Sequence, residues 1–101
     1  MFYNVLKADD VVEFENEKFE HKTLLENDNS SVNIVAIKKD EIIDTHTSIS
    51  DALVYVLEGK IELHFDAQKF TLNKGEILMF KKDAEHKVLA LKDSKFFIIK
   101  I

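Results

Sequence analysis

Residues 51–66 read DALVYVLEGKIELHFD, and this stretch decides the fold. Its first part, residues 52–57, is apolar at every position, which is typical of a strand with both faces covered. Glu58 and Gly59 indicate a turn. Residues 60–66 then alternate between apolar and polar side chains, as a half-buried strand does. The stretch therefore predicts two strands joined by a hairpin at Gly59.

Short apolar segments separated by turn residues lie on both sides of this pair. The further strands that we expect are residues 19–26, 32–38, 70–72, 77–80, 86–91 and 96–101. Ile42 and Ile43 lead into a polar segment, 44–48, and residues 9–15 fit either a short strand or one helical turn. No long stretch has helical periodicity. The pattern predicts an all-β chain built as a sandwich or barrel.

Composition excludes several classes of function. A chain of 101 residues with 46% hydrophobic content fits a single domain, residues 1–101. Cysteine is absent, which excludes disulfides, zinc ribbons and thiol nucleophiles. Two glycines cannot build a phosphate-cradling loop. Net charge is −5, and lysines alternate with acids without forming a basic stripe, so we expect no nucleic-acid partner.

The same sequence predicts a cytoplasmic protein that has no membrane partner. No apolar run approaches the ~18–20 residues that a membrane span requires. Residues 1–10 lack the basic, apolar and small-residue regions of a signal peptide.

Residues 40–59 carry the first part of a two-part motif. That motif reads Gly, five residues, His-x-His, three or four residues, Glu, six residues, Gly. Laid on the chain without gaps, it places Asp40 at the opening glycine, His46 and Ser48 at the two histidines, Ala52 at the glutamate and Gly59 at the closing glycine.

Residues 75–90 carry the second part, which reads Gly, five residues, Pro-x-Gly, two residues, His, three residues, Asn. Gly75 takes the first glycine, Lys81 the proline, Asp83 the second glycine, His86 the histidine and Ala90 the asparagine. Together the two parts resemble the signature of the cupin family, over about residues 40–90 and in the manner of small single-domain bacterial cupins. The resemblance implies a single jelly-roll β-barrel.

The resemblance also implies which residues would hold a metal ion. Metal-binding cupins use three histidines and one glutamate, and this chain keeps His46 and His86 while Ser48 and Ala52 replace the other two ligands. Imidazoles suit Zn, Fe, Ni and Cu, and the resemblance implies Zn, Fe, Ni or Mn as the possible divalent metal of such a site. Asp44 lies two residues before His46, so on a regular strand both would face the same side. Asp44 is therefore the candidate third ligand, while Asp51 points the opposite way from the lost glutamate.

Three functions remain open at this point. The first is a small-molecule-binding cupin without a complete metal site, its ligand held in a barrel pocket lined by His46, Ser48, Ala52, Val54 and His86. The second is a metal-dependent enzyme of the dioxygenase or isomerase type that uses His46, His86 and Asp44. The third is a non-catalytic structural or regulatory module that acts through a dimer surface.

We also expect a homodimer. Residues 52–57, 77–80 and 96–101 are apolar on both faces, yet a small barrel has only one interior. Large exposed apolar patches are unusual on monomers. A second copy is the simplest cover for the outer faces. The remaining histidines, His21 and His64, are expected on the surface.

Overall fold

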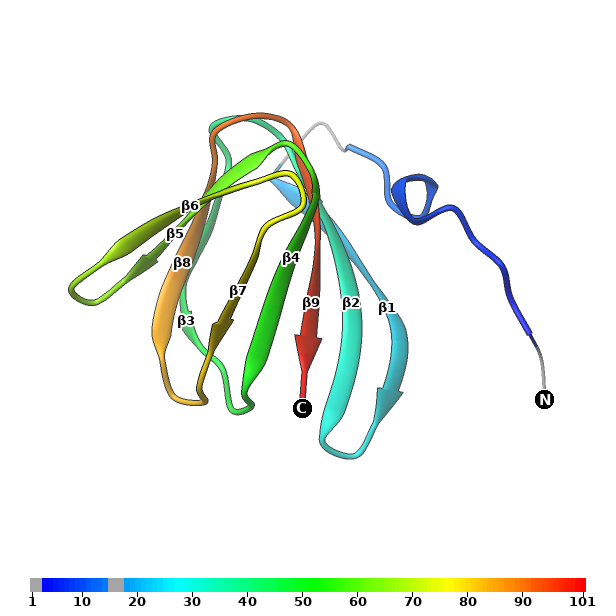
Figure 1. Ribbon diagram of the computed structural model, residues 1–101, viewed down its shortest axis with the longest axis horizontal. Helices are drawn as coiled ribbons and strands as arrows, with labels where there is room; N and C mark the ends of the chain where they lie inside the picture. The colour runs from blue at the N-terminus through cyan, green and yellow to red at the C-terminus, as the bar shows by residue number, and fades with distance from the viewer. Residues whose placement is uncertain (1–2, 15–17) are drawn as a thin grey trace.

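The computed structural model describes residues 3–14 and 18–101, and two antiparallel sheets that face each other dominate it (Figure 1). The strands are β1 (Phe19–Asn27), β2 (Ser30–Ile37), β3 (Ile42–Thr47), β4 (Ala52–Glu58), β5 (Lys60–Phe65), β6 (Lys69–Asn73), β7 (Ile77–Phe80), β8 (Glu85–Ala90) and β9 (Ser94–Lys100). One short 3-10 turn, η1 (Ala8–Asp10), precedes them. The expected all-β jelly-roll barrel is confirmed, and no helix in the described ranges could cross a membrane.

The path of the chain between the sheets corrects one expectation. The five-stranded sheet has the order β1-β2-β9-β4-β7, and the four-stranded sheet has the order β3-β8-β5-β6. β4 and β5 therefore belong to different sheets and do not pair, so Gly59 does not turn a hairpin. It turns a corner that carries the chain from one sheet to the other. The corner requires a glycine because Gly59 lies against the backbone of Asp93 and Ser94 at the start of β9.

The core lies between the two sheets and is built by the alternation of the strands. Inward side chains of the five-stranded sheet meet those of the four-stranded sheet, and both contribute to one buried cluster. Its buried members are Val35, Ile37, Val54, Val56, Ile61, Leu63, Leu72, Val88, Ala90 and Phe96. Burial of this apolar surface is the main favourable term in folding.

The N-terminal segment covers part of the outer face of the five-stranded sheet. Val12 is fully buried there against Ile34 and Ala36 of β2. The ammonium of Lys95 holds this segment, because it donates to the carbonyl of Asp9 and lies 5.0 Å from the centre of the Phe14 ring. The residues before η1 extend away from the sheets (Figure 1). The outer face is therefore covered at β2 and left open toward β7.

Four backbone positions keep the geometry of the two-part motif even where its residues differ. Gly59 and Gly75 have φ of +92° and +85°. Asp40 and Asp83, which stand at the other two glycine positions, have φ of +73° and +72°. Aspartate is one of the few residues other than glycine that visits this left-handed region. The chain therefore retains the turns of the motif with two aspartates.

Candidate ligand-binding pocket

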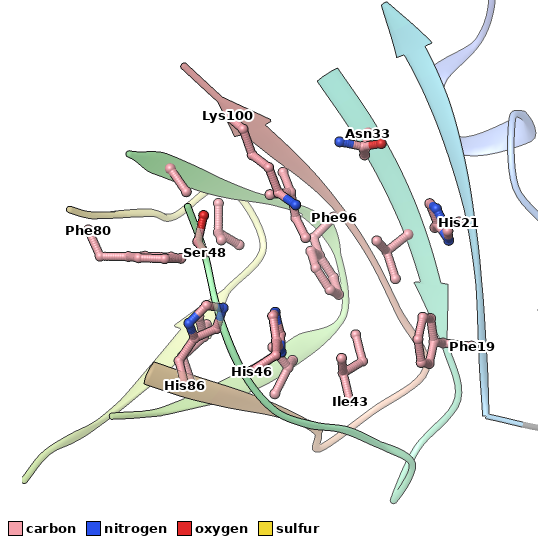
Figure 2. Close-up of a pocket in the computed structure, with 16 residues that line it drawn as sticks. Phe19, His21, Asn33, Ile43, His46, Ser48, Phe80, His86, Phe96 and Lys100 are labelled. Atoms are coloured by element: carbon pink, nitrogen blue, oxygen red, sulfur yellow. The ribbon is translucent and has the colours of Figure 1, made fainter. Parts of the chain in front are cut away.

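A cavity of about 180 Å³ opens between the two sheets (Figure 2). Its lining combines an apolar wall with a polar group of side chains. The apolar wall consists of Phe19, Val35, Ile43, Ala52, Val54, Leu63, Phe80, Val88, Phe96 and Ile98, and the polar side chains are His21, Asn33, His46, Ser48, His86 and Lys100. An engineered cavity of about 150 Å³ in another protein holds benzene, so this space suits a molecule the size of one ring.

His46 and His86 lie side by side in the cavity. They are direct partners in the antiparallel pairing of β3 with β8, and their ring centroids are 4.2 Å apart at an interplanar angle of 60°. The two rings therefore come from neighbouring strands of one sheet rather than from opposite walls. All five residues expected to line the pocket, His46, Ser48, Ala52, Val54 and His86, do line this cavity.

Hydrogen bonds fix the tautomer of both histidines. His46 Nδ1 lies 2.8 Å from the carbonyl oxygen of Asp44, and His86 Nδ1 lies 2.9 Å from that of Ala84. A carbonyl oxygen only accepts, so each Nδ1 must carry the proton and donate it. In the neutral rings each Nε2 is then an acceptor. The pair can accept hydrogen bonds from a ligand or bind a cation.

His86 is only 5% exposed, and its surroundings disfavour the protonated ring. Burial lowers the pKa of His86 below its ordinary value near 6.5, and the positive charges of His46 and Lys100 lower that pKa further. The hydrogen bond to Ala84 acts in the opposite direction and is the smaller effect against burial. The other neighbours of the His86 ring are Phe65 and Phe80, which carry no charge.

This lowered pKa predicts that acid destabilises the fold. Well above pH 6.5 the ring is neutral in both states and contributes no pH dependence. As pH falls below 6.5, the unfolded chain binds the proton first, so the free energy of unfolding declines by up to about 1.4 kcal/mol per pH unit. Urea unfolding between pH 8 and pH 5 should show that His86→Gln has a flatter profile than the wild type. Thr71→Gln, at an exposed site on β6 that carries no titratable group, should keep the wild-type slope. Equal slopes for His86→Gln and wild type would refute the prediction.

Asp44 does not join the two histidines, which corrects the expected three-residue set. The pairing of β3 with β8 shifts register between Ile43 and His46, so the strand carries a bulge there. Because of the extra residue, Ile43 and His46 both line the cavity although they are three positions apart. Asp44 is exposed, and only its backbone carbonyl contacts the His46 ring. The rule of alternation fails here because the strand is not regular.

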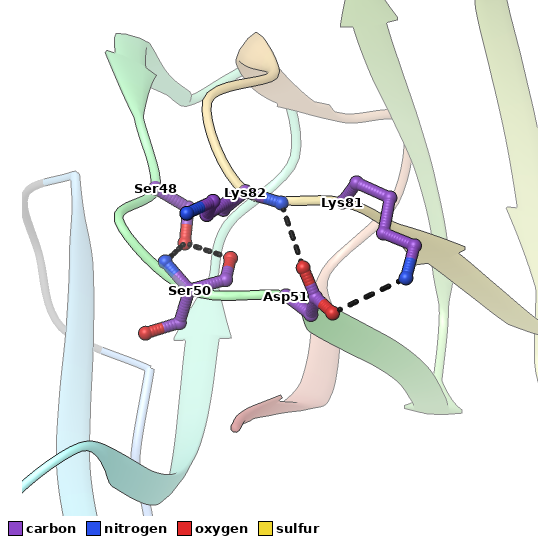
Figure 3. A network of polar contacts seen from close by, with 5 residues as sticks. All are labelled: Ser48, Ser50, Asp51, Lys81 and Lys82. Carbon is purple, nitrogen blue, oxygen red and sulfur yellow. Dashed lines mark hydrogen bonds and ion pairs between the residues drawn. The ribbon is translucent and has the colours of Figure 1, made fainter.

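Ser48 and Asp51 hold the loop at the edge of the cavity (Figure 3). The Ser48 hydroxyl donates to the Ser50 carbonyl at 2.8 Å and accepts from the Ser50 N–H at 3.2 Å. The Asp51 carboxylate accepts the Lys82 N–H at 3.0 Å and pairs with the Lys81 ammonium at 3.5 Å. The Lys82 hydrogen bond is the main reason why the pKa of Asp51 lies below its ordinary value. Asp51 is thus bound outside the cavity, as its position in the sequence predicts.

Eleven of the sixteen lining residues were not identified from the sequence as part of the pocket, among them Phe19, His21, Asn33 and Lys100. His21 is exposed, as expected, but it also borders the cavity. For Lys100 the sequence does contain a pattern that indicates an inward-facing side chain. Positions 96, 98 and 100 share one face of β9, and the first two are inward-facing apolar residues, so a lysine in the same series points inward. His64, by contrast, lies away from this cavity and contacts the Glu62 carboxylate at 2.6 Å.

The donors present do not make a complete site for the metal ion that metal-binding cupins carry. His46 and His86 would supply two imidazole nitrogens, but no group of three His, Asp or Glu side chains lies close enough to hold an ion within residues 3–14 and 18–101. Ser48 is a poor ligand for such ions and its hydroxyl proton is engaged by Ser50. Ala52 has no donor atom.

Fold and site together define a small jelly-roll barrel with an interior pocket that contains a histidine pair. The Cupin domain family model matches residues 33–100, and the chain belongs to that family. No curated protein matches the sequence.

Several solved structures are similar to this chain. A conserved protein of unknown function from Streptococcus pyogenes is 20% identical with a TM-score of 0.90, and the match covers 100% of this chain and 89% of that one. A cupin superfamily protein from Desulfitobacterium hafniense is 21% identical with a TM-score of 0.85, over 93% and 85% of the two chains. A cupin 2 conserved barrel domain protein from Leptotrichia buccalis is 29% identical with a TM-score of 0.84, over 92% of this chain and 45% of that one.

Proposed function

We propose that this cupin binds a small molecule in the pocket between its sheets without a complete metal site. The observation that supports this proposal is that one cavity contains both an apolar wall and two histidines that can accept hydrogen bonds. Pockets that bind small molecules combine these two features, because the apolar wall supplies affinity and a few polar groups set orientation. We also propose a cytoplasmic location, which rests on the sequence alone.

A screen of neutral and charged one-ring compounds tests this function. We expect ligands to perturb the ring-proton NMR signals of His46 and His86 and to raise the melting temperature. Ala52→Leu should lower the affinity for every such ligand about tenfold or more, because the added carbons fill part of the cavity that Ala52 lines. Thr71→Leu is the matched control, since Thr71 is exposed on β6. A screen in which no compound perturbs either ring would refute the function and favour the structural or regulatory module.

A metal-dependent enzyme is the second candidate, and the tautomer of the histidine pair favours it. Both Nδ1 atoms donate to carbonyls, which leaves both Nε2 atoms free for a ligand, an arrangement common around metal-bound histidines. With only two protein donors we expect weak binding of Zn²⁺ or Ni²⁺. Removal by a mild chelator with little change in melting temperature would agree with the small-molecule function. An ion that survives strong chelation and greatly stabilises the protein would favour the enzyme.

We further propose that two copies pair through the outer face of the five-stranded sheet at β4, β7 and β9. Ile77 and Met79 of β7 are 52% and 69% exposed there, and Leu53, Ile99 and Ile101 line an open apolar groove beside Met79. The N-terminal segment covers the opposite end of this face and leaves the groove open. A second copy is the occupant that fits best, since a closed two-fold pair lets one apolar face cover its own duplicate.

Light scattering at micromolar concentration should give the mass of a dimer. Met79→Lys should shift the protein to the monomer, because it places a charge in the centre of the buried face. Phe70→Lys, at a site that is 40% exposed on the four-stranded sheet, should remain dimeric. A monomeric mass for the wild type would refute the proposed pairing.

A further inference from the structure

The ionisable side chains around the cavity are all basic. Its charged or titratable lining residues are His21, His46, His86 and Lys100, and no aspartate or glutamate lines it within the described residues. The whole chain has the opposite bias, with 19 acidic and 14 basic residues. Lys100 therefore supplies the positive charge of this pocket, inside a protein that is acidic as a whole.

Lys100 is the permanent charge of this set. Its side chain leaves β9 with the ammonium directed into the cavity (Figure 2). Across the described part of the chain, its ammonium makes no salt bridge or hydrogen bond to another side chain, whereas Lys81 and Lys95 each pair with a carboxylate. A charged group in a half-enclosed apolar space is costly unless a counter-charge reaches it.

The residue opposite Lys100 explains why no internal counter-charge is available. In the pairing of β4 with β9, Lys100 is the direct partner of Ala52. Ala52 stands at the motif position where a glutamate would occur, so the carboxylate is missing at the point where it would face this lysine. The nearby carboxylates are engaged or turned away: Asp51 is bound by Lys81 and Lys82, and Asp44 is exposed.

We propose that the pocket selects a small organic carboxylate, with the carboxylate paired to Lys100 and the apolar body against the wall formed by Val35, Val54 and Phe96. The inference rests on the proposed function, because it names the class of ligand for the same pocket. Charge-assisted hydrogen bonds between an ammonium and a carboxylate are about twice as strong as neutral ones. The volume of about 180 Å³ limits the body to about one ring.

Matched pairs of ligands test the charge preference. Calorimetry and histidine NMR would compare acetate with acetamide, isobutyrate with isobutyramide and benzoate with benzamide at one pH and salt concentration. We expect each carboxylate to bind at least about tenfold more tightly than its amide, and benzoate to bind most tightly of all. Added salt should reduce the difference in affinity between carboxylate and amide. Amides that bind as well as their carboxylates would overturn the inference and leave the proposed function intact. No binding by any member, together with a silent general screen, would overturn both.

Variants at the facing pair of positions assign the preference to Lys100. Lys100→Met keeps the length and apolar stem of the side chain. It should lower the affinity of the pocket for benzoate to its affinity for benzamide. Lys100→Arg should retain the preference, because the charge is kept. Ala52→Glu places a carboxylate opposite Lys100 and should also abolish the preference. A full benzoate preference in Lys100→Met would overturn the assignment, and the benzamide affinity of each variant shows that its pocket is still formed.

Discussion

We expect Gly59→Ala to lower the free energy of unfolding by about 2–6 kcal/mol, a large fraction of the about 5–15 kcal/mol that stabilises an ordinary domain. Two effects add. The φ of +92° is a conformation that alanine adopts only with strain. A Cβ at this position would also lie 2.4 Å from the Asp93 carbonyl oxygen and 2.6 Å from Ser94 Cα. Both of those atoms belong to the backbone, so the contact is relieved only if the start of β9 moves away from the corner.

Gly75→Ala is the matched control for this prediction. Gly75 has a similar φ of +85°, but a Cβ there meets no atom within 4 Å. The control therefore carries the backbone strain without the clash, and we expect a loss of about 1–3 kcal/mol. Urea unfolding, or thermal unfolding if Gly59→Ala is too unstable for urea, measures the difference between the two variants. Equal losses would show that the corner at Gly59 is not constrained by β9.

The sequence was most informative where alternation is regular. Strands β4, β5 and β9 were predicted within two residues of their observed ends, because their apolar residues recur at every position or at every second one. The motif positions also indicated that His46 and His86 belong to one site, and both side chains line one cavity.

The sequence was least informative where the backbone departs from regular geometry or where distant strands meet. Asp44 was expected beside His46, but the bulge in β3 reverses the alternation between them, and nothing in the residues 42–46 marks a bulge. At Gly59 the sequence predicts a hairpin where the structure has a corner between the sheets, because both kinds of turn use a glycine. The pairing of Ala52 with Lys100 joins residues 48 positions apart, and local patterns carry no information about such a contact.

Phe96→Ala should be the other severely destabilised variant, with a loss of about 3–5 kcal/mol. Phe96 is fully buried, it is the largest such side chain in the described residues, and its strand β9 lies in the middle of the five-stranded sheet. Its direct partners in the neighbouring strands are Val35 and Val56, both in the same buried cluster. Removal of the ring therefore leaves a void that these neighbours can fill only in part.

The same substitution should enlarge the ligand pocket, because the Phe96 ring forms part of its wall. We expect benzene at millimolar concentration to raise the melting temperature of Phe96→Ala more than that of the wild type, since removal of the ring adds apolar volume to a cavity that already suits one ring. Phe70→Ala is the control: Phe70 is 40% exposed on β6, so its loss should cost only about 1 kcal/mol and leave the benzene response as it is in the wild type. Thermal unfolding of the three proteins with and without benzene decides the matter. Equal destabilisation of the two variants would mean that Phe96 does not anchor the core. A benzene response in Phe96→Ala that is no larger than that of the wild type would mean that the cavity collapses when the ring is removed.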